Sequence, residues 1–332
     1  MPRNVVLVRM DGIGDALALA PLIAALRDAG HRLAAVLSTR NRDAFAPLTF
    51  AHVHVLERIP WPAHGSTRAT YDGALADARA AAYDVALIAS EEPEAYRFAR
   101  EARIGTRVGF TNGFEKPLKS LWTRTQLTRA LVRPASAERE REHEVETLFR
   151  LGEGLHAEAE PTRDPSRLRP LVVGDVPRHG RVVVQLTQKL DALGVAPEEL
   201  RDALHDVACA LPTIAVADPR EEPYARELAA SSGLDLRITE SPAEWKALIA
   251  GATAVVTPDS GAAHVAGMTG VGCVDLFADG PDTGAALRRW YPWASPRVWT
   301  VPVTRRVAAQ FRSQLLAGIE YVSLEPAVQA QQ

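Results

Sequence analysis

The sequence is poor in cysteine and aromatic residues, and it carries little net charge. Its 332 residues include two cysteines, and aromatic residues make up 6% of the chain. Because Cys209 and Cys273 lie far apart in the chain, we expect neither a disulfide framework nor a cysteine-based metal site. Two buried thiols in a reducing compartment are the simpler interpretation, and we expect no metal site.

The charge and hydropathy patterns exclude further classes of protein. The formal net charge of −3 gives no global basic field, so nucleic acid is not expected as a partner. No apolar run approaches the roughly 20 residues that a membrane-spanning helix needs. The chain enters its first apolar run at Val5 without a signal-peptide pattern, which favours a cytoplasmic protein. The length allows two domains.

Short apolar runs alternate with longer stretches at helical spacing. The runs lack polar alternation, as strands buried on both faces should, and their order predicts parallel sheets with right-handed crossovers. Expected strands are Val5–Val8, Arg32–Leu37, His52–Val55, Val85–Ile88, Arg181–Gln185, Thr213–Val216, Ala254–Val256 and Cys273–Leu276. Expected helices are Ala16–Ala29, Tyr71–Ala82, Glu138–Leu151, Pro197–Ala210, Glu222–Ser231, Glu244–Ala250 and Val307–Tyr321.

A proline-rich, charged segment divides the chain. Residues 156–178 contain four prolines and read as a linker, with a strand around Leu171–Val173. We expect an N-terminal domain at 1–155, a C-terminal domain at 179–304, and a C-terminal helix and tail at 305–332.

Two turns rich in glycine and aspartate each follow an apolar run and open a helix. In the first, Gly12 and Gly14 allow a tight turn and Asp15 begins the helix. Asp15 is either a helix cap or a base that takes a proton from an acceptor hydroxyl, and Asp11 is a second candidate. The dinucleotide fingerprint is incomplete because Leu17 replaces its third glycine.

The second turn is Pro258-Asp259-Ser260-Gly261, with His264 one turn into the following helix. Asp259 or Ser260 would cap that helix, and Gly261 permits a phosphate to approach the backbone. Free N–H groups and the positive helix end favour an anion there. A lone histidine is usually a structural one, but its position beside this turn makes His264 a candidate for binding.

Three segments in the same order resemble glycosyltransferase family 9, the ADP-heptose:lipopolysaccharide heptosyltransferase family. They are Leu7–Leu17 with Pro21–Arg27, His143–Gly152, and Leu248–Ala266, in which Asp259-Ser260-Gly261-x-x-His264-x-Ala266 resembles the family's donor-binding motif. The resemblance implies a GT-B fold, with two Rossmann-like domains whose parallel sheets face an interdomain cleft. It also implies inverting transfer from a nucleoside-diphosphate sugar, ADP-linked, without a cofactor or catalytic metal.

The resemblance assigns roles to individual residues. Asp15 matches the family's general base, and Asp259, Ser260, Gly261 and His264 match the donor-binding segment, whereas Asp11, Gly12 and Gly14 would line the acceptor side. The family's glycine-rich turn and its Lys-x-Trp-Pro element are missing from residues 184–197. Thr187 and Lys189 are the candidates for the phosphate contact there, with a plain surface lysine as the alternative.

A basic stretch lies between Arg97 and Arg141. Leu118, Leu121, Trp122, Thr125 and Val132 fall near one helical face, and Lys116, Lys119 and Arg124 are among the cations around it. The alternatives are a solvated helix, or a surface for an anionic acceptor or anionic lipid headgroups. The second alternative predicts an anionic glycan or glycolipid acceptor and peripheral contact with the inner membrane surface. The resemblance implies that this acceptor is lipopolysaccharide core or another glycan.

Two other functions remain open from the sequence. One is a GT-B protein that binds a nucleotide or glycan with weak or no transfer activity. The other is a GT-B sugar-nucleotide epimerase; a dehydrogenase is disfavoured by the incomplete glycine fingerprint.

Overall fold

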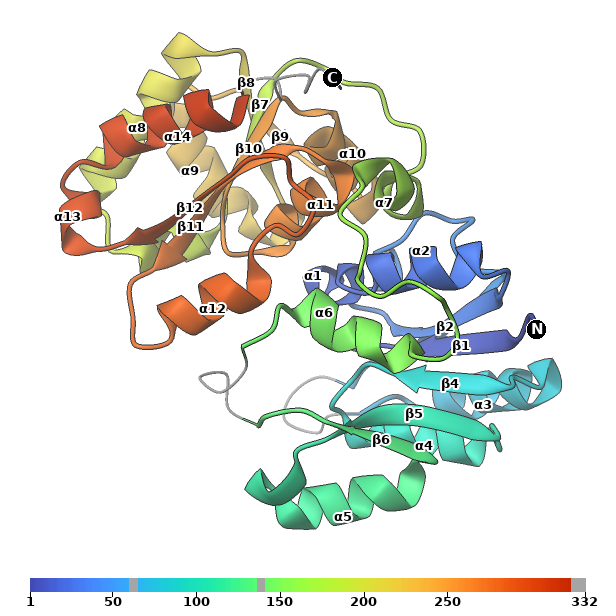
Figure 1. Ribbon diagram of the computed structural model, residues 1–332. Coiled ribbons are helices and arrows are strands. Elements are labelled where there is room, and N and C mark those ends of the chain that lie inside the picture. The colour runs from blue at the N-terminus through green and yellow to red at the C-terminus, as the bar shows by residue number, and fades with distance from the viewer. Residues whose placement is uncertain (60–64, 136–140, 324–332) are drawn as a thin grey trace, which may run out of the picture. The chain divides into compact units, whose positions relative to one another are not determined.

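The computed structural model describes residues 1–59, 65–135 and 141–323. The chain divides into two compact units, Met1–Arg163 and Asp164–Gln332, called here the first and second unit (Figure 1). Among the described helices, none is both long and apolar enough to cross a membrane.

The first unit alternates strands and helices. Its elements are β1 (Asn4–Val8), α1 (Ile13–Leu17), α2 (Ala20–Asp28), β2 (Arg32–Ser38), β3 (His52–Leu56), α3 (Arg68–Ala81), β4 (Val85–Ile88), α4 (Pro93–Glu101), β5 (Thr106–Thr111), η1 (Gly113–Glu115), α5 (Pro117–Gln126), β6 (Arg129–Val132), α6 (Glu144–Phe149) and η2 (Arg150–Gly152).

Its six strands form one parallel sheet in the order β3-β2-β1-β4-β5-β6. The central strands β1 and β4 are aliphatic and almost wholly buried, because helices cover both faces of the sheet. Val6, Val8 and Ile88 pack with apolar residues of α3 and α4 on one face. Figure 1 shows α2 and α6 on the other face.

The second unit repeats this plan. Its elements are α7 (Pro165–Val172), β7 (Val182–Gln185), η3 (Gln188–Leu193), α8 (Pro197–Ala210), β8 (Thr213–Ala217), η4 (Pro219–Glu221), α9 (Glu222–Ser232), β9 (Leu236–Ile238), α10 (Pro242–Gly251), β10 (Ala254–Pro258), α11 (Gly261–Thr269), β11 (Gly272–Ala278), α12 (Thr283–Trp290), β12 (Val298–Val303), α13 (Arg305–Ala308) and α14 (Phe311–Ser323).

Its parallel sheet has the order β12-β11-β10-β7-β8-β9. Read from the other edge, this is the same winding as in the first unit: three strands wound outward one way, then three the other. In such sheets ligands bind at the carboxyl ends of the two strands where the winding reverses. Those strands are β1 and β4 in the first unit, and β7 and β10 in the second.

The strand expected around Leu171–Val173 is wrong, because this segment is the end of helix α7. Asp164 caps α7 by accepting a hydrogen bond from the Ser166 N–H at 2.9 Å, and Pro165 occupies the first turn. The Arg169 guanidinium donates to the carbonyls of Ala250 and Val176, which fixes α7 to the second unit. A capped helix start thus lies inside the segment that its composition presents as a linker.

The helical face expected in the basic stretch is only partly correct. Helix α5 ends at Gln126, and Val132 belongs to the edge strand β6. The expected helix Ala16–Ala29 is interrupted between Leu17 and Ala20, and Val307–Tyr321 is divided between α13 and α14. The start of the expected helix Glu138–Leu151 lies outside the described residues, and α6 begins at Glu144.

The C-terminal helix α14 is part of the second unit. A side chain at Gly272 would collide with the Val322 backbone of α14, and one at Gly318 would lie tightly against Trp299. The Arg312 guanidinium forms two hydrogen bonds with Asp206 of α8, at 2.7 and 2.9 Å. The expected domain limits stay a prediction.

Candidate active site

In the second unit, two predicted segments meet at the winding reversal. Thr187 and Lys189 follow β7, and Asp259 and Ser260 follow β10, the strand hydrogen-bonded to β7. Because parallel strands end at the same edge, these residues gather at one place although about 70 positions separate them in the chain.

Ser260 is the residue that caps α11. Its hydroxyl accepts from the Ala262 N–H at 3.2 Å and lies 2.8 Å from the Thr257 hydroxyl. Gly270, in the left-handed conformation, ends this nine-residue helix. Of the two capping candidates in the sequence, the structure therefore selects Ser260. The Asp259 side chain is left at the mouth of the turn.

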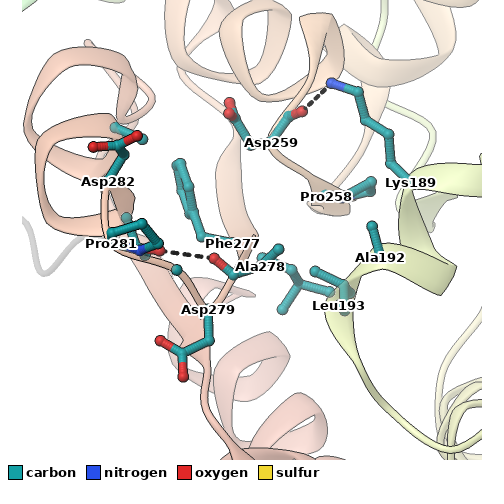
Figure 2. A pocket seen from close by; sticks show the side chains of 14 residues that line it. Lys189, Ala192, Leu193, Pro258, Asp259, Phe277, Ala278, Asp279, Pro281 and Asp282 are labelled. Atoms are coloured by element: carbon teal, nitrogen blue, oxygen red, sulfur yellow. Dashed lines mark hydrogen bonds between the residues drawn. The ribbon is translucent and has the colours of Figure 1, made fainter. Parts of the chain in front are cut away.

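Lys189 extends from η3 to this turn. Its Nζ donates to the Asp259 carbonyl at 2.6 Å (Figure 2). Within the described ranges, no carboxylate forms an ion pair with Lys189. A cationic group and a helix N-terminus thus lie side by side, the arrangement that favours a phosphate.

Two pockets flank Lys189. One, of about 390 Å³, lies between η3 and the loop Ala278–Thr283, and Figure 2 shows Phe277 and Asp282 in its wall. The other, of about 400 Å³, contains Thr187, Ser260 and Gly261. Its remaining walls come from the ends of β7 and β8 and from α10, namely Gln185, Gln188, Asp218, Arg220, Glu221 and Trp245.

Glu221 and Trp245 are binding candidates that the sequence reasoning missed. The Glu221 carboxylate accepts from the Thr187 hydroxyl at 3.0 Å and from the Gln188 N–H at 3.3 Å. The Trp245 indole donates to the Gln185 amide at 2.7 Å. In many Rossmann domains, a carboxylate near the end of the strand after the first βα unit holds ribose. The position of Glu221 after the second strand of this unit is therefore the sequence feature that could have identified it.

His264 lies in the first turns of α11 but lines neither pocket. It is 6% exposed, and its ring packs edge-to-face on Trp290 at 5.5 Å between centroids. The contact makes His264 part of the packing between α11 and α12. Its predicted contact with a donor stays a prediction.

A buried carboxyl, that of Asp275, lies on β11 opposite Thr257 of β10. The side chain is inaccessible to solvent, and neither oxygen has a hydrogen-bond partner among the described residues. Burial, reinforced by the charge of Asp259, raises the pKa of Asp275 well above its usual value, although Lys189 acts in the opposite direction.

In the first unit, the first turn surrounds a buried arginine that the sequence reasoning did not single out. Arg9 is 4% exposed, and its guanidinium lies 2.9 Å from Asp11, 3.5 Å from Asp15 and 3.5 Å from Glu144. It also donates to the Ala89 carbonyl beyond β4. Because Arg9 directly follows the apolar run of β1, its charge is buried and needs partners. This position is the sequence feature that could have identified Arg9.

The surroundings of Asp15 are compatible with both roles predicted for it, the helix cap and the base. One oxygen accepts from the Gly12 N–H at 3.0 Å, so the carboxylate caps the five-residue helix α1. The side chain is nevertheless about one-third exposed. Burial raises the pKa of Asp11, and the charge of Arg9 opposes this effect. Because carboxylates occupy this turn, it suits a proton acceptor better than an anion site.

Glu144 and Arg133 extend this charged cluster. Glu144 is inaccessible to solvent and lies 2.6 Å from the Arg133 guanidinium, in addition to its contact with Arg9. His143 caps α6 through Nδ1, which accepts from the Val145 N–H at 3.1 Å. No local sequence pattern could show that Arg9 reaches Glu144, because the two residues lie more than 120 positions apart.

The three cations predicted for acceptor binding differ in their surroundings. Lys119 forms an ion pair with Glu91 at 3.1 Å. Burial acts to raise the pKa of Glu91, but Lys119 and Arg133 hold it below its usual value. Lys116 and Arg124 are exposed. Phe114, Leu118 and Leu121 beside them are also largely exposed.

Two doubly wound parallel sheets define the class: the chain has the α/β fold of the GT-B glycosyltransferases. Neither a protein-family model nor a curated protein sequence matches the chain. Solved structures do. A family 9 glycosyl transferase from Veillonella parvula has a TM-score of 0.71 at 12% identity, covering 98% of each chain. Heptosyltransferase WaaC from E. coli, solved with ADP, has a TM-score of 0.71 at 17% identity over 95% of this chain and 99% of its own.

An epimerase is also similar, although less so. A UDP-N-acetylglucosamine 2-epimerase from Methanocaldococcus jannaschii has a TM-score of 0.55 at 12% identity, covering 97% of this chain and 93% of its own. At these identities the likenesses establish the fold alone. They confirm the expected fold and a heptosyltransferase-like arrangement of elements.

Proposed function

We propose that this protein is an inverting glycosyltransferase that works without a catalytic metal. It moves a heptose-like sugar from a nucleoside-diphosphate donor, ADP-linked, to lipopolysaccharide core or another glycan acceptor. The single observation that carries the proposal is the hydrogen bond of Lys189 to Asp259, which places this cation beside the Ser260-capped N-terminus of α11. The similar E. coli structure was solved with ADP, which supports the choice of nucleotide.

The donor would bind to the second unit. Lys189 and the Gly261 N–H stabilise the diphosphate, and the pocket containing Glu221 and Trp245 accepts the nucleoside. Glu221 is placed to accept hydrogen bonds from ribose hydroxyls, and the Trp245 indole offers an apolar surface to the base.

The transfer needs a base as well as a leaving-group site. Asp15 takes the proton of the acceptor hydroxyl as the hydroxyl oxygen attacks the anomeric carbon. The bond from that carbon to the phosphate oxygen breaks, and the nucleoside diphosphate leaves with the electron pair. Lys189 and the helix N-terminus stabilise the charge that develops on the leaving group.

The test is a nucleotide screen by thermal shift and calorimetry with ADP, UDP, GDP and CDP. We expect ADP to bind most tightly and Lys189→Ala to weaken it roughly tenfold or more, since a charge-assisted contact is lost. Lys116→Ala, in the first unit, is the matched control. Equal binding of all four nucleotides, or none, would remove the ADP-linked donor from the proposal.

An activity assay separates transfer from the two alternatives. Incubation of the protein with ADP-heptose and deacylated lipopolysaccharide core should release ADP and lengthen the glycan. Conversion of UDP-N-acetylglucosamine to its 2-epimer would instead favour the epimerase reading. Tight ADP binding with no turnover of any donor would favour a protein that only binds.

We further propose that α5 contacts an anionic membrane surface that holds a glycolipid acceptor. Phe114, Leu118 and Leu121 are 100%, 83% and 66% exposed, and Lys116 and Arg124 accompany them. Apolar side chains among cations suit the headgroup region of such a surface. Co-sedimentation with anionic vesicles at low salt should be lost in Leu118→Asp/Leu121→Asp; absence of binding by the unaltered protein would contradict this proposal.

A further inference from the structure

A second cluster of chemically active side chains lies on β3, the edge strand of the first sheet. His52 and His54 are two positions apart, and residues at this spacing on a strand lie on the same face of the sheet. Helix α3 packs against β3 and supplies Asp77. The ligand atoms of the three side chains all lie within 4.8 Å of one another.

The His54 ring is held with one nitrogen unpartnered. Its Nε2 lies 2.8 Å from the Tyr83 hydroxyl. Its Nδ1 is buried and has no hydrogen-bond partner among the described residues. His54 as a whole is only 3% exposed. In the tautomer with the proton on Nε2, this N–H donates a hydrogen bond to the Tyr83 hydroxyl, and Nδ1 carries a free lone pair. A buried lone pair without a partner is unfavourable unless something binds it.

The surroundings of this lone pair suit a cation. The rings of His52 and His54 lie 4.3 Å apart between centroids, inclined by 66°. The three residues line a pocket of about 420 Å³ that also contains Arg32 and Tyr83, leaving space for a water ligand.

We propose that His52, His54 and Asp77 bind one divalent transition-metal ion, with Zn²⁺ the best match. Two imidazoles and one carboxylate are ligands that Zn²⁺ accepts readily, whereas Mg²⁺ and Ca²⁺ require oxygen atoms. In a tetrahedral site the ligand atoms lie about 3.4 Å apart. The ligand atoms here lie within 4.8 Å of one another, and two of the three side chains, those of His52 and Asp77, are exposed. The bond from Nε2 of His54 to Tyr83 is the outer hydrogen bond that a metal-bound histidine usually makes.

The position of this site indicates a structural role. His52 begins β3, so the cluster lies at the amino ends of the strands, whereas Asp11 and Asp15 follow the carboxyl end of β1. A metal ion here would join the edge strand β3 to α3. The inference is independent of the proposed function, because it concerns the stability of the first unit.

The sequence contains this pair as His52-x-His54, but it predicts no metal site. A search for metal-ligand spacing around the cysteines misses it, since neither Cys209 nor Cys273 takes part. Asp77 lies 23 positions beyond His54, and only the packing of α3 on β3 brings it to the pair.

The experiment starts from the full-length protein freed of metal by chelation and desalting. Zn²⁺ is titrated by calorimetry, and Co²⁺ by its visible absorption, which reports tetrahedral coordination. We expect the cluster to bind one ion and to raise the melting temperature. His52→Ala and His54→Ala should each weaken binding roughly 100-fold, and Asp77→Asn roughly tenfold.

Two controls make the result decisive. His205 and Cys209 lie one turn apart on α8, with Nε2 and Sγ separated by 3.5 Å, so a His205→Ala/Cys209→Ser variant removes a competing pair. This variant should bind Zn²⁺ as the unaltered protein does. Because His52 is exposed, His52→Ala should melt normally without metal, which separates loss of binding from loss of folding. No binding by the unaltered protein at 100 µM Zn²⁺, or binding by His52→Ala and His54→Ala that is as tight as that of the unaltered protein, would overturn the proposal.

Discussion

At the scale of single residues, the carboxyl groups of Asp15 and Asp275 have different surroundings. Asp15 combines a capping hydrogen bond with an accessible side chain, whereas Asp275 is sealed from solvent without a hydrogen-bond partner. The first suits proton transfer, and the second stores a cost in stability. Each therefore calls for a different measurement.

Asp15→Asn should reduce transfer by roughly 10²- to 10⁴-fold, because the amide cannot take the acceptor proton. The amide oxygen still accepts from the Gly12 N–H, so the turn should keep its fold. Steady-state kinetics with the donor found by the nucleotide screen measure the loss, and calorimetry should give an unchanged affinity for the nucleotide. Asp43→Asn, an exposed carboxylate of the same unit, is the control. If Asp11→Asn rather than Asp15→Asn abolishes transfer, Asp11 is the base.

Asp275→Asn should stabilise the protein at neutral pH. The pKa of Asp275 is raised in the folded state, so the folded state binds its proton more tightly than the unfolded state. Its contribution to stability therefore falls as pH rises above the unfolded pKa of about 4. Relative to the unaltered protein, the variant should gain roughly 1–3 kcal/mol at pH 7 and little at pH 4. Urea unfolding at the two pH values measures this, and a gain that does not depend on pH would contradict the titration of Asp275.

At the scale of elements, the buried cluster of Arg9, Glu144 and Arg133 joins helix α6 to the end of β1 and to the segment after β6. Glu144→Gln removes the negative charge between two buried guanidinium groups. We expect a loss of roughly 3–5 kcal/mol in the free energy of unfolding, as for other broken buried pairs. Urea denaturation provides the measurement. Glu153→Gln, whose exposed partner is Arg129, should cost less than about 1 kcal/mol.

The strands also show which sequence patterns are sufficient to predict a secondary-structure element. The central strands β1, β4, β7 and β10 are continuous aliphatic runs and are predicted correctly, because burial on both faces dictates their composition. The strands β5, β6, β9 and β12 are missed, because each is short, partly exposed or interrupted by polar residues and so lacks that signature.

The same contrast holds for the candidate site. Ser260 is predicted from a local motif, since turns that follow strands have recognisable residues, whereas Lys189 is only a candidate because the family's motif is missing around it. Glu221, Trp245 and the partners of Arg9 are missed, because only the winding of the sheet brings them to the site. Sequence pattern thus predicts the residues of each turn, and topology decides which turns meet.

At the scale of the whole molecule, the two units share one winding order but hold different chemistry. The winding reversal of the first unit gathers carboxylates around Arg9, whereas that of the second gathers Lys189 and a helix N-terminus. The identical folds therefore do not imply identical ligands. Acidic groups in one unit suit proton removal, and cationic groups in the other suit an anion.

This division predicts separate responses in hydrogen exchange of the full-length protein. ADP should slow amide exchange at residues 186–190 and 259–264, because the nucleotide covers the ends of β7 and β10. Zn²⁺ should instead slow exchange in β3 and α3, since a metal ion at His52, His54 and Asp77 would hold the edge strand to its helix. Each unit has its own buried apolar core, so neither ligand needs the other to protect its own elements. Protection by ADP confined to β3 and α3 would contradict the donor site as placed here, and protection by Zn²⁺ confined to the second unit would contradict the metal site.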